Sequence, residues 1–501
     1  MNAGSKHYKK IIIAVGAQLV AVLGTISALA QVTGTPGDVR RDRYLLLDSR
    51  IIESTTNAVL RLGSPRKDPQ NPLFGETWES RFDNPYAKVI YDHEDKLYKC
   101  WYNVFVSSRL EEETPRENRG DVEWNTSNRQ AGICYAYSPD GVKWIKPELG
   151  LVECHGNKKN NLVFTSRHQV TVMKDIREND PRKRYKAIEP SQKGSLVWYS
   201  ADGIHWQEKK IQGIDHGDTH NCVFWDETIA KYVLFTRTKD TQYGRPLYRQ
   251  VSRAVSDDFI HWEKAKLVFQ GRSTEEQFHD LTVFPHGGVY LGLIGIMDVD
   301  GTDRQWAELA WSPDSKSWHR IEPGKAFIPN SPVVGDYDWG CVFPGRPIFQ
   351  EDGILLYYGA NNNRFFGWRD GFLARAILRP DGFAGYEQEK ATWWQPDQPE
   401  KVREQEKVKA GYVVTKPVPV TGNTVCVTAD IAPGGYVAVR VMDAATGRKV
   451  AESSRLKKTT TDEVLAWKWT DEAFLLEKAM GKEVIFEFEF LSAKLFSFAF
   501  K

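Results

Sequence analysis

Ser200-Ala-Asp202-Gly203-Ile-His-Trp206 is the stretch that decides the fold, because the chain repeats it. Close copies begin at Ser138, Ser256 and Ser312, so successive copies start 62, 56 and 56 residues apart. A degenerate fifth copy, Arg379-Pro-Asp381-Gly382-Phe383, keeps the Asp-Gly pair and lacks the tryptophan. Recurrence at a nearly fixed period indicates one supersecondary unit that is stacked repeatedly.

The residues before each copy indicate what that unit is. In one repeat, residues 220–226, 231–237 and 248–256 read as three strands that lead into the Asp turn and its tryptophan. Copies of the first two strands are expected at 87–91 with 97–102, 170–174 with 185–189, 281–285 with 289–296, and 341–349 with 354–359. Five such meanders predict an all-β chain whose main domain is a five-bladed β-propeller. The repeated turn is then structural, and its tryptophan packs between blades.

The propeller is expected over residues 31–395, with the blades at about 75–385 and an N-terminal extension, residues 31–70, wrapped around them. Residues 396–409 are rich in charge and carry two prolines, which is typical of a linker. Short alternating strands follow, such as 424–431, 436–442 and 484–490. They predict a small C-terminal β-sandwich over 410–501.

The N-terminus has the pattern of a cleavable signal peptide over residues 1–30. Lys9 and Lys10 precede a mostly apolar run that ends in Ala28-Leu-Ala30. We therefore expect export to the periplasm or the extracellular space, with no membrane contact after cleavage; a membrane anchor is the alternative reading. The net charge of +1 gives no indication of a nucleic acid partner. The six cysteines lack metal-ligand spacing and are expected to be buried thiols.

Several phrases resemble the five-bladed glycoside hydrolases of families 32, 43, 68 and 117, and in particular the secreted family-32-like glycosidases. The resemblance covers about residues 65–385, and the tail is similar to the small sandwich that follows such propellers. The phrases are Asn71-Pro-Leu with Trp78-Glu79, Lys146-Pro-Glu-Leu-Gly-Leu151 with Asn160-Asn-Leu-Val163, Asp218-Thr-His-Asn221 before Val223-Phe-Trp-Asp226, and Tyr357-Tyr-Gly359. The Asn-Asp-Pro-Asn-Gly, Arg-Asp-Pro and Glu-Cys motifs of the invertase type do not occur. The resemblance implies a glycosidase, but the catalytic carboxylates have to be argued by position.

The innermost strands of a propeller run in one direction, so residues just before them meet at one mouth. Glycoside cleavage needs two carboxyl groups there, one to protonate the leaving oxygen and one to activate water or attack. The candidates are Asp83, Asp218, Glu276, Asp280 and Asp338. Glu275 and Asp336 lie beside members of this set in the chain. Each also has a structural alternative, such as shaping a turn, capping backbone amides or pairing with an arginine.

Polar and aromatic residues near the same strand starts are the expected substrate-binding groups. They are Arg167, His168, His216, His220, Asn221, His279 and Trp339. Arg346 and Arg364 could hold an acidic or sulfated sugar, with solvation at the surface as the alternative. No histidine pair has the spacing of a helical zinc site, so no catalytic metal and no required cofactor are expected. A structural calcium or sodium ion in the channel is compatible with the sequence.

These observations predict a secreted glycoside hydrolase, exo-acting on an oligo- or polysaccharide through two carboxyl groups. Two alternatives remain. A non-catalytic carbohydrate-binding propeller would have its inner carboxylates paired with arginine and its mouth plugged. A glycoside phosphorylase would need a cluster of basic residues at the mouth to hold phosphate. The sequence does not indicate the sugar, the linkage or the oligomeric state.

Overall fold

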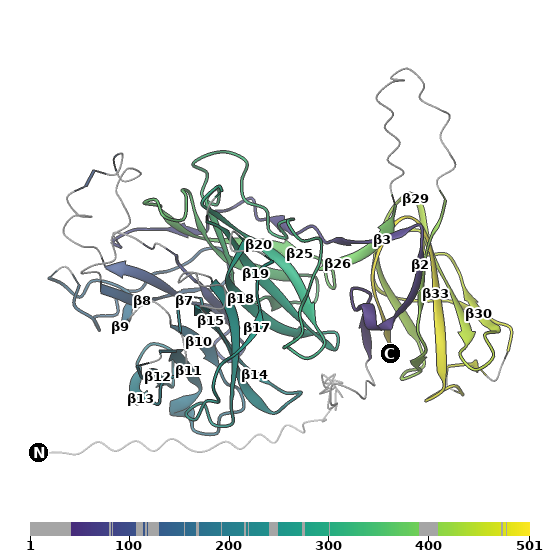
Figure 1. The fold of residues 1–501 in the computed structure, drawn as a ribbon, viewed down its shortest axis with the longest axis horizontal. Helices are drawn as coiled ribbons and strands as arrows, with labels where there is room; N and C mark the ends of the chain where they lie inside the picture. The colour runs from purple at the N-terminus through teal and green to yellow at the C-terminus, as the bar shows by residue number, and fades with distance from the viewer. Residues whose placement is uncertain are drawn as a thin grey trace, which may run out of the picture.

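The protein is built almost wholly from β-strands (Figure 1). The computed structural model describes residues 42–501 apart from 80–81, 83, 107–113, 116–117, 119–129, 155, 167–169, 192, 215–216, 219, 240–248, 273–275, 300, 390–408, 472–473 and 477. In this part of the chain the named helical turns, Ser49–Ile51 and Pro181–Lys183, are three-residue 3-10 turns. No helix among the described residues is long and apolar enough to span a membrane. The expected signal peptide and linker lie outside the described residues.

Three antiparallel sheets of four strands correspond to three of the predicted meanders, and each follows chain order. The first contains β6 (Lys88–Asp92), β7 (Leu97–Val106), β8 (Gln130–Ser138) and β9 (Leu162–Ser166). The second contains β10 (Thr171–Lys174), β11 (Tyr185–Glu189), β12 (Ser195–Ser200) and β13 (Gln207–Ile211). The third contains β14 (Cys222–Asp226), β15 (Lys231–Lys239), β16 (Arg249–Ser256) and β17 (Lys266–Phe269). The strand positions expected from the repeats are thereby confirmed.

The last two predicted meanders form a ten-stranded sheet. One half is β18 (Glu276–His286), β19 (Val289–Asp298), β20 (Arg304–Ser312) and β21 (His319–Arg320). The other half is β22 (Cys341–Pro344), β23 (Ile348–Phe349), β24 (Ile354–Asn361) and β25 (Gly371–Leu378), edged by β4 (Arg66–Lys67) and β5 (Phe74–Gly75). A single parallel pairing of Gln305 with Cys341 joins the halves.

The first strand of each meander lies toward a shared centre. β6 contacts β10, β10 contacts β14, and β14 contacts β18. Residues of these strands, together with the segment that follows β22, line a single cavity. We call these strands the inner strands, and we call the end of the array at which they begin the mouth.

The repeated turn has the structural role that the sequence predicts. In each of the four copies, one carboxylate oxygen of the aspartate accepts two backbone amides; for Asp202 they are those of Ile204 and His205, at 2.8 and 2.9 Å. The tryptophans then reach neighbouring sheets, since Trp206 packs edge-on against Phe164 of β9 and Trp318 against Phe235 of β15. Each turn therefore stabilises its own sheet and joins it to the next.

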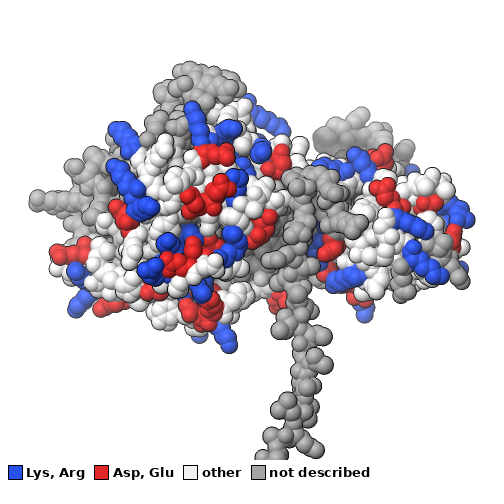
Figure 2. Space-filling model, turned by 90° about the horizontal axis from the view of Figure 1, so that it is seen from below, with Lys and Arg blue, Asp and Glu red and all other residues white. Residues whose placement is uncertain are grey.

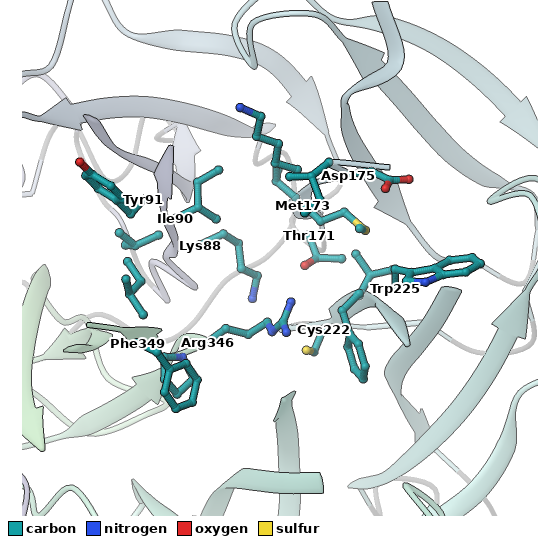
Figure 3. A pocket seen from close by; sticks show the side chains of 18 of the residues that line it. Lys88, Ile90, Tyr91, Thr171, Met173, Asp175, Cys222, Trp225, Arg346 and Phe349 are labelled. Carbon is teal, nitrogen blue, oxygen red and sulfur yellow. The ribbon is translucent and has the colours of Figure 1, made fainter. Parts of the chain in front are cut away.

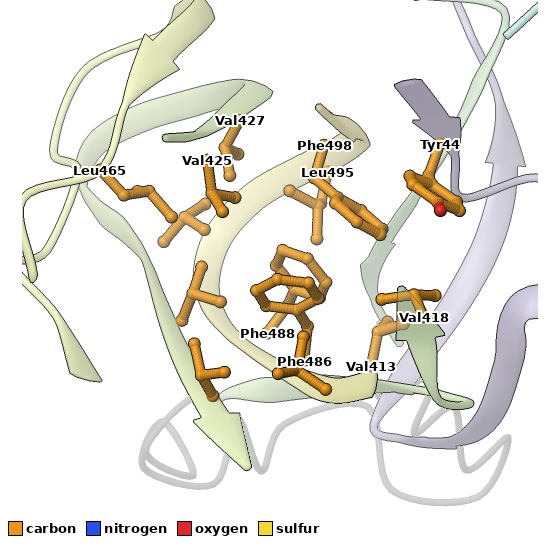
Figure 4. Close-up of a cluster of buried hydrophobic side chains, with 14 of the residues drawn as sticks. Tyr44, Val413, Val418, Val425, Val427, Leu465, Phe486, Phe488, Leu495 and Phe498 are labelled. Carbon is orange, nitrogen blue, oxygen red and sulfur yellow. The ribbon is translucent and has the colours of Figure 1, made fainter. Parts of the chain in front are cut away.

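The C-terminal strands form a separate eleven-stranded sheet, which in Figure 1 lies beside the other sheets. Its longest strands are β29 (Val425–Asp443) and β33 (Glu483–Phe500), which pair along most of their length. Their apolar side chains, including Phe486, Phe488 and Phe498, fill its core (Figure 4). The other members are β1 (Arg43–Leu45), β2 (Ile52–Thr56), β3 (Ala58–Leu62), β26 (Ala384–Gln388), β27 (Gly411–Thr415), β28 (Val418–Pro419), β30 (Lys449–Ser453), β31 (Thr460–Val464) and β32 (Trp467–Trp469).

This sheet differs from the expectation for the N-terminal extension. Residues 43–62 pair with the C-terminal strands, β1 with β33, β2 with β27 and β3 with β26, while Leu45 and Leu47 pack into the apolar cluster of the ten-stranded sheet. Tyr44 stacks on Phe498 with the ring centroids 4.7 Å apart. The chain thus enters the C-terminal sheet first, builds the repeated sheets and then returns.

The six cysteines form no disulfide, and all are buried. This agrees with the expectation of buried thiols. Surface charge is mixed on the face that Figure 2 shows, where basic and acidic side chains are interspersed. That face presents no broad basic surface of the kind that nucleic acid binding requires.

Candidate functional site

Four aromatic and imidazole side chains form a layer across the mouth. Tyr86 precedes β6, His220 precedes β14, His279 lies in β18 and Phe343 lies in β22. Tyr86 stacks on His220 with centroids 4.9 Å apart, and its hydroxyl lies 3.3 Å from His279 Nε2. Phe343 packs edge-on against both Tyr86 and His220. This layer is the floor of the mouth.

The floor holds two residues in an unusual backbone conformation. Tyr86 has a φ of 43° and His220 a φ of 51°. Bulky side chains rarely adopt this left-handed region, and such strain persists only where the surroundings enforce it. The strained geometry turns both rings toward one another across the channel.

Asp280 is the buried anion beneath the floor. Its carboxylate lies 2.7 Å from His279 Nδ1 and 3.2 Å from His220 Nδ1, and it accepts a hydrogen bond from Gln305 Nε2 at 3.2 Å. Burial alone would raise the Asp280 pKa, but the two imidazoles outweigh burial and hold it well below its usual range. Burial lowers the pKa of His279 to about 3. The nearby Arg237 and Arg249 also lower this pKa, whereas Asp280 acts to raise it. Both imidazoles are therefore neutral at pH 7, and Asp280 is ionised.

Two arginines lie above the floor, on the second and third strands of the third sheet. Arg237 pairs with Asp218, and its Nε and one terminal nitrogen are buried without a hydrogen-bond partner among the described residues. Arg249 donates to Gln277 Oε1 at 2.6 Å, and its Nε is likewise without a partner there. Burial, aided by repulsion from Arg237, lowers the pKa of Arg249 to about 10. Unsatisfied buried donors are rare and favour a site that awaits a ligand.

Asp303 supplies a carboxyl group of the opposite character. It lies between β19 and β20 at the mouth, where Oδ2 accepts the Phe366 amide at 3.1 Å. Its Oδ1 is buried without a hydrogen-bond partner among the described residues. Burial raises the Asp303 pKa in spite of the nearby Arg369 and Arg364. Asp218 and Asp303 both lie within electrostatic range of Arg249.

A second carboxyl group with a raised pKa borders the mouth. Glu76 Oε1 accepts the amides of Phe82 and Gly371 at 2.8 and 3.1 Å. Burial raises its pKa to about 8, with Asp370 and Glu79 acting in the same direction. Nearby, Arg369 donates to Asn84, whose amide in turn donates to the Tyr86 hydroxyl at 2.6 Å.

The structure brings together part of the set predicted from the sequence. Asp218, Asp280, His220 and His279 belong to one group at the mouth, and Asn221 is buried directly after His220. We call Asp218, Arg237, Arg249, His279, Asp280 and Asp303 the mouth cluster. Asp83, Arg167, His168, His216 and Glu275 lie outside the described residues.

Glu276, Asp338 and Trp339 have other neighbours. Glu276 forms an ion pair with Arg320 of β21 at 2.7 Å. Asp338 is fully buried, pairs with Lys67 of β4 at 2.5 Å and accepts from the Tyr358 hydroxyl at 3.1 Å. Trp339 is half-buried under the Arg304 guanidinium, 4.7 Å from its ring centroid. None of these contacts is shared with the mouth cluster, so the catalytic roles expected of Glu276 and Asp338 stay predictions that their placement does not favour.

A β-bulge in β18 explains why the side chains of Glu276 and Asp280 have different neighbours. In a regular strand, residues four apart face the same side. The pairing of β18 with β19 shifts between Phe278 and Asp280, which breaks that alternation. Glu276 and Asp280 therefore face opposite sides of the sheet, Glu276 toward Arg320 and Asp280 toward His220 and His279.

Arg237, Arg249, Asp303 and Glu76 were missed because only residues before inner strands were considered. In an antiparallel meander the second strand ends, and the third begins, at the end where the first begins. Arg237, near the end of β15, and Arg249, at the start of β16, satisfy that rule. Asp303, just before β20, satisfies it too. Applying the rule to all three strands would have found these three residues from the sequence.

The described residues contain no group of three or more histidine, cysteine, aspartate or glutamate side chains arranged to hold a metal ion. The histidines at the mouth are instead committed to Asp280 and Tyr86.

No family model and no curated protein matches the chain. The solved structures that match the chain do so at low identity. A glycoside hydrolase is 14% identical with a TM-score of 0.41, covering 67% of this chain and 95% of that chain. A β-1,2-mannobiose phosphorylase from Listeria innocua is 13% identical with a TM-score of 0.43, covering 63% and 96%. A putative glycosidase from Bacteroides thetaiotaomicron is 15% identical with a TM-score of 0.38, covering 63% and 97%. The reaction is therefore argued from the residues of this chain.

Proposed function

We propose that the chain is a glycoside hydrolase whose active site is the mouth of a five-bladed β-propeller. One observation carries the proposal: Asp303, with a raised pKa and one oxygen without a hydrogen-bond partner among the described residues, shares the neighbourhood of Arg249 with Asp218. A carboxyl group with a raised pKa beside a second carboxyl group is the arrangement that acid–base cleavage of a glycosidic bond uses. The five meanders around one cavity support the propeller.

Each group has a role in this proposal. Asp303 is the general acid that protonates the leaving oxygen, because burial favours its protonated form. Asp218 is the base or nucleophile, and its ion pair with Arg237 holds its carboxylate at the mouth. Asp280 is a positioning residue, since its contacts with His220 and His279 fix the floor on which the sugar would rest.

Phosphorolysis is the second candidate, and one specific feature favours it. Arg237 and Arg249 present buried N–H groups without hydrogen-bond partners among the described residues, beside the two carboxyl groups. Paired arginines suit a phosphate nucleophile, because the guanidinium fork matches its oxygens. In that reaction phosphate would replace water, and Asp303 would keep its role as the acid.

Three further features are part of the proposal. The substrate is an oligo- or polysaccharide that is attacked from a chain end, since a pocket at a propeller mouth suits exo action. The protein is exported by its N-terminal signal and acts in the periplasm or outside the cell. No cofactor takes part in the reaction.

The test is a screen of oligosaccharides with the purified protein, with and without phosphate. We expect free sugars from the wild type in both buffers, and turnover that is lower by orders of magnitude in Asp218→Asn and Asp303→Asn. Sugar 1-phosphates formed only in phosphate would instead establish phosphorolysis. Glycan binding without any product would overturn both reactions and leave the binding propeller, for which the pairing of Asp218 with Arg237 is an argument.

A further inference from the structure

The cavity at the centre of the sheet array is distinct from the mouth. It has a volume of about 480 Å³, within the range of small-molecule sites. Its walls are residues 88–94 of the first sheet, 171–177 of the second, 222–227 of the third, Thr282 and residues 346–349. No residue of the mouth cluster lines it. The lining residues come after Tyr86, His220 and Phe343 along the chain, so the cavity lies farther along the inner strands than the floor.

Two cations reach into this cavity from opposite walls. Figure 3 shows Lys88 and Arg346 pointing toward its centre, with Cys222 beside them. The Cys222 thiol is within electrostatic range of both. Arg346 packs over the Phe224 ring, 4.9 Å from its centroid, and this holds the guanidinium in place.

Neither cation has an anionic partner in the described part of the chain. Arg346 Nε is buried without a hydrogen-bond partner among these residues, and no ion pair joins either side chain to a described carboxylate. Lys88 faces Cys222, Asp280, Cys100 and His220, of which only Asp280 is a carboxylate. Asp280 lies beside His279 and His220, and no ion pair joins it to Lys88 among the described residues.

The acidic residues of the lining are also committed elsewhere. Glu94 pairs with Lys174 and Arg184, both at 2.8 Å. Asp175 pairs with Lys186 at 2.7 Å, and Glu227 lies 3.9 Å from Arg177. The cavity therefore contains two positive charges that form no ion pair with a described carboxylate; Asp280, which lies within electrostatic range of Lys88, does not line it. Burying one such charge costs several kcal/mol unless a counter-charge is bound.

We propose that this channel cavity binds an oxyanion, a sulfate or phosphate group that bridges the Lys88 amine and the Arg346 guanidinium. The arginine supplies two parallel N–H donors and the lysine a point charge, which together match a tetrahedral anion. The hydroxyl group of Thr171 lies on the same lining. The cavity is larger than a bare oxyanion needs, so it has room for either an inorganic ion or the sulfate or phosphate ester of a sugar. This site is separate from the proposed reaction and does not depend on it.

The primary experiment is a titration of the full chain with sodium sulfate at pH 7, followed by calorimetry and by thermal unfolding, with sodium chloride at equal ionic strength as the reference. We expect saturable binding and a rise in Tm of roughly 2–5 °C that chloride does not reproduce. Lys88→Met and Arg346→Met should each lose both effects. The exposed Lys266 of β17 gives the matched control, since Lys266→Met should bind sulfate as the wild type does.

Two further binding measurements show which kind of compound carries the anion and where in the molecule it binds. A sugar sulfate or sugar phosphate that binds at least about tenfold tighter than the inorganic ion identifies an ester as the ligand. Arg249→Met removes a mouth cation and should leave sulfate binding unchanged. Loss of binding in Arg249→Met, with retention in Lys88→Met, would place the anion at the mouth and overturn the proposal.

A wild-type measurement covers the case in which the channel variants fail to fold. Burial lowers the pKa of Lys88 to about 8, and sulfate keeps its charge between pH 6 and 10. Sulfate affinity should therefore fall at least about fivefold between pH 7 and pH 9.5, as Lys88 loses its proton. Absence of saturable binding at pH 7, or an affinity that does not change with pH, would contradict the proposal.

Discussion

At the residue scale, two aspartates of the third and second sheets have opposite duties although they lie only sixteen positions apart. Asp202 belongs to the repeated turn and accepts the amides of Ile204 and His205. Burial would raise its pKa, but the hydrogen bonds from His205 and these amides outweigh that and lower the pKa to about 2. Asp218 pairs with Arg237 at the mouth.

We therefore expect Asp218→Asn to fold as the wild type does and to lose turnover by orders of magnitude. Asp202→Asn should keep its turnover and lose about 1 kcal/mol of unfolding free energy. The side-chain carbonyl oxygen of asparagine accepts the same backbone hydrogen bonds less strongly than a carboxylate does. Turnover and thermal unfolding of both variants, on whichever glycan the wild type cleaves, provide the check. Wild-type turnover in Asp218→Asn would move the chemistry to Asp280 or Asp303.

The proposed acid makes a prediction about pH. Because burial raises the Asp303 pKa, its protonated form persists at higher pH than that of an ordinary aspartate. The rate should fall as the pH rises through that raised pKa. With an ordinary sugar as leaving group, Asp303→Asn should be slow at every pH and should lack this limb. With a good leaving group such as nitrophenolate, which needs no protonation, Asp303→Asn should not be slow. A pH–rate profile of Asp303→Asn with the wild-type limb would exclude Asp303 as the acid.

Glu76 makes a separate prediction about stability. Its pKa of about 8 lies above the ordinary value of 4.5, so its contribution to stability is complete below pH 4.5 and is lost as the pH rises toward 8. Glutamine at this position can accept the same amides of Phe82 and Gly371 without ionising. Glu76→Gln should therefore gain stability relative to the wild type between pH 5 and pH 8, on the order of 2 kcal/mol. Denaturant unfolding measures this gain.

The exposed Glu208 of β13 provides the control for that comparison. Glu208→Gln should follow the wild type across the same pH range. If the unfolding free energy of Glu76→Gln changed with pH in parallel with that of the wild type, Glu76 would be ionised in the folded protein at neutral pH.

At the scale of single elements, the strands were predictable and their irregularities were not. Alternating apolar residues before each Asp turn mark the first and second strands of every meander, and the observed bounds follow them. The bulge in β18, between Phe278 and Asp280, leaves no such mark in the sequence. It decides which of Glu276 and Asp280 faces the channel, so the site was predicted less well than the fold.

The repeated turn also gives a test of how sheets are joined. Gly203 has a φ of 79°, and a Cβ there would lie 2.5 Å from the Trp101 ring of the neighbouring sheet. Gly150 has a φ of 70° and nothing within 4 Å of its Cβ position. Gly150→Ala should cost about 1 kcal/mol through backbone strain alone, whereas Gly203→Ala should cost roughly 2–4 kcal/mol because the ring must also move. Equal losses in denaturant unfolding would show that the turn does not brace the two sheets.

At the scale of the whole molecule, the arrangement of the chain could be predicted only in part. The 56-residue recurrence indicates stacked sheets around a centre, and the cavity lined by their first strands is consistent with the proposed propeller. The pairing of residues 43–62 with the C-terminal strands could not be predicted, because these strands are short and their partners lie more than 300 positions away. Local patterns do not indicate such partners.

This pairing leads to the last prediction, which concerns truncation. Tyr44 and Leu46 are buried in the core of the eleven-stranded sheet, and β1, β2 and β3 cover strands β33, β27 and β26. Arg43 and His286 also meet at Asp381, which accepts a hydrogen bond from Ser497 of β33. A chain that begins at residue 63 should therefore lose the cooperative unfolding of the C-terminal sheet and aggregate, since it exposes that core. A chain that begins at residue 42 should unfold as the longer protein does. Scanning calorimetry of the two chains distinguishes them, and identical transitions would mean that the C-terminal strands fold without their N-terminal partners.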